Sequence, residues 1–125
     1  SGGSVVGAHE LYTASQEPWD ADLATTQGNF AANFAGVAES RSDDGDEKPV
    51  AVRQAGVHRF PCNSASFALG AHIAPESNDP GGSPDGLEDQ IVVEATSSES
   101  IGRIYKAYPD AVTEVLARVA GAQLP

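Results

Sequence analysis

The side chains that could act as nucleophiles, bases or metal ligands are widely spaced along the chain. His9, His58 and His72 each fall on a different predicted strand, and no two stand four residues apart as a helical metal-binding pair would. Cys62 is the single cysteine, which excludes an intrachain disulfide and a cysteine-rich zinc site. No serine lies in the Gly-x-Ser-x-Gly turn that presents a hydrolase nucleophile; the candidates are Ser64, Ser97, Ser98 and Ser100. These spacings predict a protein that is not an enzyme and holds no cofactor.

Two acidic stretches have the composition of calcium-binding loops but not the spacing. A calcium loop presents oxygen ligands at alternating positions around a glycine and ends in a bidentate acid. The first stretch lacks this order and is flanked by Arg41 and Lys48, so an exposed turn is favoured over a calcium site. The second is interrupted by proline and glycine and is interpreted as a loop, with weak metal binding as the alternative. The stretches comprise Glu39, Asp43, Asp44, Asp46 and Glu47, then Glu76, Asp79, Asp85, Glu88 and Asp89.

Aromatic side chains offer a second kind of binding site. Trp19, Tyr12, Tyr105 and Tyr108 could stack against a sugar ring. Packing in the core or at a strand edge explains these few residues equally well, so carbohydrate binding stays an alternative.

The composition limits the possible partners. The chain has 125 residues and a mass of 12.8 kDa, the size of one small domain. Its 7 basic and 18 acidic residues give a formal net charge of −11. Nucleic-acid binders neutralise phosphates with cations, so this balance predicts neither nucleic acid nor an anionic membrane surface as a partner. Hydrophobic residues make up 40% of the chain, enough for a core, and no apolar run approaches the ~18 residues of a membrane-spanning helix.

The elements that would position these side chains are mostly short strands. Glycine and proline, 13 and 8 residues, are spread along the whole chain, as is typical of strands joined by turns. The sequence predicts a mainly β, small single-domain barrel or sandwich of about seven short strands with one short helical turn. Residues 1–27 are expected to form an N-terminal strand or arm and a loop, and residues 28–125 the β-rich core. The strand patterns cover residues 5–12, 35–38, 50–53, 57–62, 67–73, 90–94, 101–106 and 112–119.

Local signals add further expectations. Thr25 or Thr26 is expected to cap a helical turn over residues 29–34, with Phe30 and Phe34 on one face. Residues 50–53 and 57–62 are expected to form a hairpin, residues 75–86 a long surface loop, and Pro109 with Asp110 a turn. Residues 112–119 also fit a helical period, but the β-rich pattern before them favours a strand.

The order of five stretches resembles that of the small capsid decoration proteins, which stabilise the heads of tailed phages and prophages. The stretches are residues 28–39 (GNFAANFAGVAE), 49–61 (PVAVRQAGVHRFP), 68–74 (ALGAHIA), 100–104 (SIGRI) and 113–119 (TEVLARV). The evidence is the succession rather than any single motif. The chain departs from the family pattern at Ala71, where an acidic residue is usual, and in a longer loop over residues 75–89.

The resemblance implies a structural role. It implies a β-barrel-like homotrimer that binds the major capsid protein between capsomers on the outer surface of the virion, after synthesis in the host cytoplasm. Val5, Val6 and Ala8 are the expected contacts with the capsid or with a neighbouring subunit. The alternative from another class is a secreted β-sandwich module that binds calcium or carbohydrate, and a small acidic enzyme is the least supported.

Overall fold

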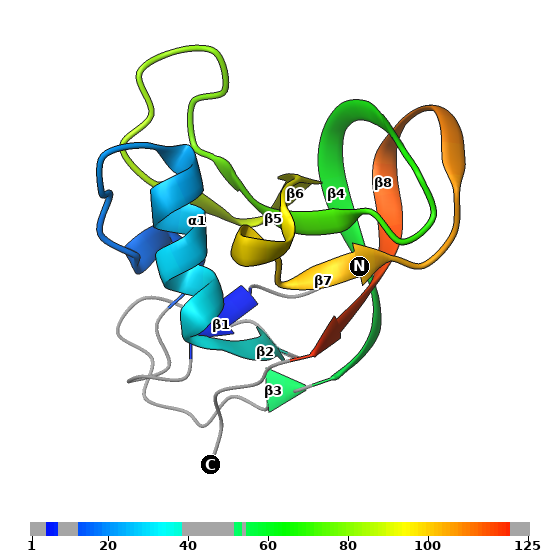
Figure 1. The fold of residues 1–125 in the computed structure, drawn as a ribbon, viewed down its shortest axis with the longest axis horizontal. Coiled ribbons are helices and arrows are strands. Elements are labelled where there is room, and N and C mark those ends of the chain that lie inside the picture. The colour runs from blue at the N-terminus through cyan, green and yellow to red at the C-terminus, as the bar shows by residue number, and fades with distance from the viewer. Residues whose placement is uncertain (1–4, 8–12, 39–51, 54, 121–125) are drawn as a thin grey trace.

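A closed five-stranded β-barrel forms the body of the protein (Figure 1). The computed structural model describes residues 5–7, 13–38, 52–53 and 55–120. Around the barrel the strands follow the order β4-β6-β5-β7-β8, and β8 pairs with β4 to complete the closure. The prediction of a mainly β, small single-domain barrel or sandwich is confirmed, and of these two forms the structure has the barrel. The barrel strands are β4 (Ala55–Phe67), β5 (His72–Ser77), β6 (Leu87–Glu94), β7 (Gly102–Ile104) and β8 (Tyr108–Ala120).

A smaller antiparallel sheet lies beside the barrel. Its strands are β1 (Val5–Gly7), β2 (Phe34–Ala38) and β3 (Val52–Arg53), in that order across the sheet. Every residue of β2 is buried, because the sheet packs against the rest of the molecule. Two 3₁₀ turns, Ala14–Gln16 and Ser97–Glu99, complete the described short elements.

One helix, α1 (Leu23–Ala32), packs against the side of the barrel that carries β5 (Figure 1). The buried Gln27 side chain donates a hydrogen bond of 2.7 Å from Nε2 to the carbonyl oxygen of Pro75. This bond satisfies a buried amide that would otherwise cost free energy, and it ties α1 to β5. None of the described helices is long and apolar enough to cross a bilayer.

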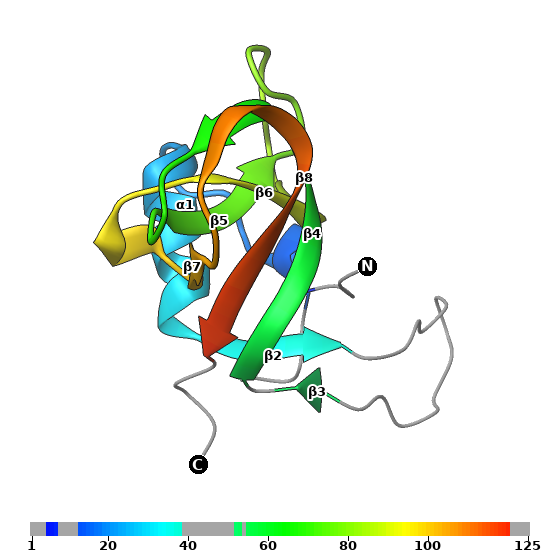
Figure 2. The same cartoon turned by 90° about the vertical axis from the view of Figure 1, so that its right-hand side faces the viewer.

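The two longest strands, β4 and β8, form one side of the barrel (Figure 2). Phe60 lies opposite Val115, and Arg59 lies opposite Leu116. Successive side chains of a strand point to opposite faces, so Phe60 and Val115 are buried inside the barrel while Arg59 is exposed outside it. On its other edge β4 pairs in parallel with β6.

One hydrophobic core joins the barrel, the small sheet and α1. Val5 and Ala14 belong to it, so residues before position 28 contribute core side chains as well as the strands after it. The large buried members include Phe30, Phe34, Phe60, Phe67, Ile73 and Leu87.

The helix differs from the expected turn. It is ten residues long, and its N-cap is Asp22 rather than Thr25 or Thr26. Phe34 lies in β2 and not in the helix, although its ring still contacts that of Phe30 at a centroid distance of 6.1 Å. The expectation was wrong because Asp22 is also a strong capping residue and tertiary packing allows the helix to begin earlier.

The expected hairpin is also wrong. β3 pairs with β2, and β4 pairs with β8 and β6. Alternation along the chain identifies a strand but not its partner, and the β8 partner of β4 lies far along the sequence.

Two proline-containing segments are strands rather than a loop and a turn. Pro75 is buried in β5, which continues to Ser77, so the surface loop spans only residues 78–86. Pro109 is the second residue of β8. Proline lacks the N–H of a sheet ladder, and strands accept it near their ends or at bulges; the register shift between Pro75 and Ser77 is such an irregularity. The strands over residues 35–38, 90–94 and 112–119 are confirmed, and the first acidic stretch lies outside the described residues.

The Asp22 cap gives a pH-dependent test of α1. Asp22 Oδ1 accepts a hydrogen bond of 2.8 Å from the Thr25 backbone N–H, and this bond, with that of the Thr25 side chain, holds the pKa of Asp22 below its usual 3.8. A lowered folded-state pKa stabilises the protein above the ordinary value, and the stabilisation is lost as the pH falls through the lowered value. Thermal melts of the wild type and of Asp22→Asn across about pH 2–6 should show the wild type losing more Tm on acidification. Equal losses would contradict the cap.

Candidate functional site

The most distinctive surface of the described structure is the outer face of β4, β7 and β8. Strand alternation places Arg59, Arg103 and Arg118 outside the barrel, while Phe60, Ile104 and other alternate residues point inward. The chain between β7 and β8 adds a lysine and a tyrosine. We call this surface the basic face and define it by Arg59, Arg103, Tyr105, Lys106, Tyr108 and Arg118.

One end of the basic face holds a shallow hollow of about 150 Å³. In it, Arg59 Nη1 lies 3.2 Å from Glu114 Oε1, and about half of each side chain is exposed to solvent. An exposed pair of this kind is worth only about 0–1 kcal/mol. A drug-sized ligand needs a pocket of about 300–1,000 Å³, so the hollow is too small to enclose one.

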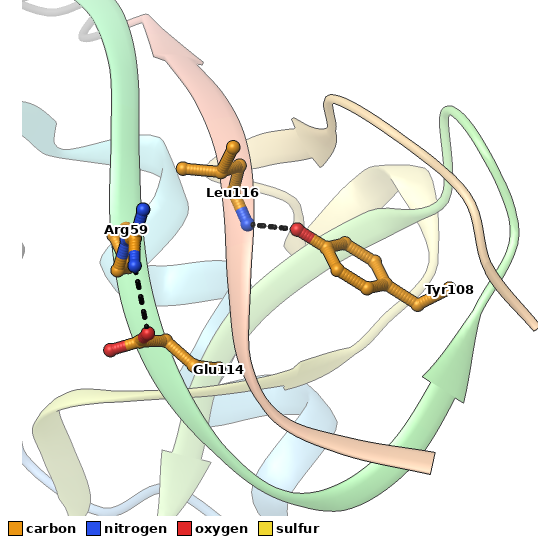
Figure 3. Close-up of polar contacts among 4 residues, drawn as sticks. All are labelled: Arg59, Tyr108, Glu114 and Leu116. Carbon is orange, nitrogen blue, oxygen red and sulfur yellow. Dashed lines mark hydrogen bonds and ion pairs between the residues drawn. The ribbon is translucent and has the colours of Figure 1, made fainter. Parts of the chain in front are cut away.

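Tyr108 is held firmly beside this hollow. Its hydroxyl oxygen accepts a hydrogen bond of 2.8 Å from the backbone N–H of Leu116 (Figure 3). The ammonium nitrogen of Lys106 lies 5.5 Å from the centre of the Tyr108 ring. Such a cation–π contact at the surface contributes about 0.5–1 kcal/mol and leaves the ammonium group open to solvent.

The other end of the basic face presents two arginines side by side. Arg103 and Arg118 are directly opposite each other in the β7–β8 ladder, and both are exposed. The Arg103 Nε–H donates a hydrogen bond of 2.8 Å to the carbonyl oxygen of Gly70, and the Arg118 guanidinium lies 5.5 Å from the centre of the Tyr105 ring. The Tyr105 residue is itself 50% exposed. Like charges directly opposite each other destabilise a strand pair, so this arrangement favours an anionic partner.

The chemistry of the basic face is that of a binding surface. Arginine and tyrosine are the residue types enriched at the centres of protein interfaces, because both combine apolar area with hydrogen bonding. The face is broad and shallow, which suits the surface of another macromolecule.

Of the sequence candidates for nucleophile and base, the structure brings His72 and Ser100 within hydrogen-bond distance of each other. His72 Nδ1 lies 2.9 Å from Ser100 Oγ, but the Ser100 hydroxyl donates to the carbonyl oxygen of Gly102 at 2.8 Å. The Ser100 hydroxyl has one proton and lies within reach of two acceptors, the Gly102 carbonyl oxygen and an unprotonated His72 Nδ1, so these distances alone do not make Ser100 a nucleophile activated by His72.

The side chains of Cys62 and His58 make packing and hydrogen-bonding contacts within the fold. The Cys62 thiol is buried and donates to the carbonyl oxygen of Val112 at 3.4 Å. Burial, and secondarily the charge of Glu114, raises the pKa of Cys62, so the unreactive thiol form dominates. His58 packs its ring against that of Phe60 at 6.1 Å, while His9 lies outside the described residues.

The residues of the second acidic stretch lie within the loop over residues 78–86 and on either side of it along the chain. Asp79 Oδ2 accepts from the Ser83 backbone N–H at 3.1 Å, and Asp85 Oδ1 accepts from Asn78 Nδ2 at 2.8 Å. The Asp89 carboxylate instead binds the backbone N–H and hydroxyl of Ser15. Within the described ranges no three His, Cys, Asp or Glu side chains converge on a possible metal position.

The remaining predicted contacts fall in several environments. Val5 is 1% exposed and packs in the chain's own core, Val6 pairs through its backbone with Gly36, and Ala8 lies outside the described residues. That these residues contact a capsid or subunit stays a prediction. Trp19 is half-buried and packs against the core rather than standing free as a sugar platform.

Sequence reasoning missed the basic face, although a signal was present. Arg59, Arg103 and Arg118 each stand at an outward position of an alternating strand pattern in an otherwise acidic chain. What the pattern could not supply was the pairing that brings the three strands together.

Comparisons of the chain with protein-family models, with curated proteins and with solved structures find no match.

Proposed function

We propose that the protein is a structural component of a virus particle that decorates and stabilises the outer surface of a tailed-phage-type capsid. It acts as a homotrimer that binds the major capsid protein between neighbouring capsomers. It performs no catalysis and uses no cofactor.

The observation that carries this proposal is the succession of five stretches that resemble the capsid decoration family. In chain order, the described parts of the first two stretches lie in α1 and β2 (28–38) and in β3 and β4 (52–53 and 55–61). The next lies in the turn before β5 and in its first residues (68–74), and the last two in β7 with the residues before it (100–104) and in β8 (113–119); none of them covers β6. The resemblance therefore involves four of the five barrel strands. This supports the proposal because the likeness lies in the order of strands rather than in scattered residues.

The shape of the protein suits a clamp. A closed barrel presents no free sheet edge to solvent, which protects it from uncontrolled pairing with other chains. A clamp works by burying surface across several subunits, and many copies on one shell multiply a modest affinity. The small size of the hollow fits this mode better than turnover of a small substrate.

The net charge is consistent with a place outside the shell. The packaged genome is a polyanion and repels a chain of charge −11, so electrostatics favours a site on the outer surface of the capsid over one in contact with the genome.

Binding to assembled shells tests the proposal directly. Purified protein should co-sediment with expanded capsids assembled from the major capsid protein of the same genome, and it should saturate at a multiple of three copies per shell. Decorated capsids should also rupture at a higher temperature than bare ones. Unexpanded shells provide the matched control, because their capsomers have not reached the final spacing.

A negative result would be equally clear. Absence of co-sedimentation at micromolar concentrations contradicts the proposal. If millimolar calcium also raised the Tm of the protein, the calcium-binding module would take its place.

A further inference from the structure

The distribution of charge divides the molecule into two unlike parts. Residues 55–67 and 102–120 carry four of the seven basic residues and two of the eighteen acidic ones. The rest of the chain carries three basic and sixteen acidic residues. The protein therefore presents one basic face on an otherwise strongly acidic chain.

The cations of the basic face are poorly neutralised by the described residues. The ion pair found there joins Arg59 to Glu114. Arg103 and Arg118 lie opposite each other with no carboxylate at ion-pair distance in the described parts of the chain. The ammonium group of Lys106 contacts the ring of Tyr108 rather than a carboxylate. Holding these cations together costs free energy in the isolated chain, and a partner that brings carboxylates would recover it.

We propose that the basic face binds the acidic loop of a second copy of this chain, and that repetition of this head-to-tail contact closes the trimer. The acidic loop is defined as residues 78–86. This inference rests on the trimeric state in the proposed function and adds the two surfaces that build it.

Symmetry favours this pairing. Copies around a threefold axis must join two different patches, because a self-complementary patch produces a twofold dimer. Two basic faces brought together would repel, as would two acidic loops. A basic patch against an acidic patch is the combination that two copies of charge −11 can bury favourably.

The acidic loop is suitably placed and ordered. It projects from the end of β5, on the side of the barrel away from β8, so it lies clear of the basic face of its own chain (Figure 1). Asp79 and Asp85 are exposed, and each uses one carboxylate oxygen in the hydrogen bonds that shape the loop. The second oxygen of each carboxylate accepts no hydrogen bond from the described residues and is available to an arginine. The exposed Tyr105 adds apolar area beside Arg118.

Sedimentation velocity of the Arg103→Gln/Arg118→Gln variant tests the contact. At about 0.1 M salt the wild type should be a trimer, and at about 1 M it should dissociate, because the Debye length falls from about 10 Å to about 3 Å. The variant should be monomeric already at low salt, with a dissociation constant raised at least tenfold. Ser64→Glu/Ser66→Glu is the matched control: it changes the net charge by the same amount at exposed positions of β4 outside the basic face, and it should remain a trimer.

A charge exchange provides the second arm. Asp79→Arg/Asp85→Arg should also be monomeric. An equimolar mixture of this protein with Arg103→Glu/Arg118→Glu should associate into heterodimers, because each supplies the charge the other lacks, but not into trimers, because a ring of three copies built from two proteins always contains one contact between like charges. Unchanged melting curves would show that the variants are folded.

The outcomes separate this inference from the proposed function. A wild type that is monomeric at about 100 µM, far above the dissociation constant of a stable complex, overturns the head-to-tail contact. So does a trimer that survives both the glutamine substitutions and high salt. If such a trimer still binds capsids, the proposed function stands without this interface; if the variants dissociate but the wild type ignores capsids, the interface stands without that function. Binding of duplex DNA by a monomeric wild type, lost in Arg103→Gln/Arg118→Gln, would reassign the face to nucleic acid.

Discussion

Gly102→Ala is expected to lower the free energy of unfolding by about 3 kcal/mol, because there is no room for the new methyl group where β7 pairs with β8. A Cβ atom at position 102 would lie 2.4 Å from the carbonyl oxygen of Arg118 and 2.9 Å from Val119 Cγ1. The first of these atoms belongs to the backbone of β8, so the clash cannot be relieved by turning a side chain. The strand pair must separate, and the barrel opens where β7 meets β8. Urea denaturation followed by circular dichroism measures the loss.

Gly28→Ala is the matched control for this substitution. Gly28 lies inside α1, where a Cβ atom would come no closer than 3.8 Å to the carbonyl oxygen of Ser98. Alanine is favoured over glycine in a helix by about 1 kcal/mol, so this variant should be slightly more stable than the wild type. Equal stability of the Gly102→Ala protein and the wild type would show that β7 and β8 do not pair as closely at this position as the structure describes.

Phe60→Ala should destabilise the protein by about 3–5 kcal/mol, because it empties the centre of the barrel. The Phe60 side chain is fully buried, points inward from β4 and lies opposite Val115. The closed barrel limits how far the surrounding strands can move to fill the space, so most of the cavity cost should remain. The denaturation midpoint should fall with little change in the slope of the transition.

Val57→Thr is the comparison for Phe60→Ala. Val57 lies on the same strand but faces outward and is 37% exposed. Threonine keeps the β-branched shape that strands favour, so the change in stability should stay within about 0.5 kcal/mol. A loss of similar size at the two positions would contradict the assignment of inner and outer faces along β4.

The predictions from sequence succeeded where a local pattern is sufficient. The β-branched run at Ile91–Val93 predicts a strand, and it lies in the C-terminal half of β6. Residues 112–119 matched both a helix and a strand, and the β-rich surroundings indicated the correct choice. Partners could not be predicted in the same way. The alternation around Arg59 identifies an outer face, but it carries no information that Glu114, 55 residues away, will lie beside it.

The basic face was missed for that same reason. Its three arginines come from three strands that meet in the folded barrel, its lysine comes from the segment between β7 and β8, and each cation alone looks like an ordinary solvated residue. Net charge concealed it further, since a sum over the chain cannot show that four of seven cations are gathered on one side. Val5, which the resemblance led us to expect at a contact with a capsid or a subunit, has its side chain in the core of its own chain, and that contact stays a prediction.

The pairing of β4 with β8 also constrains how the protein folds. During synthesis the thirteen residues of β4 emerge well before those of β8, so for a time one of the two longest strands of the barrel has no antiparallel neighbour. Contacts this distant in sequence form slowly, because a long loop must close before they return any free energy. The rate-limiting step of folding should therefore come late, after the C-terminal strand has left the ribosome. A chain halted before residue 108 would expose the edge of β4 that normally pairs with β8, and we expect such a chain to aggregate.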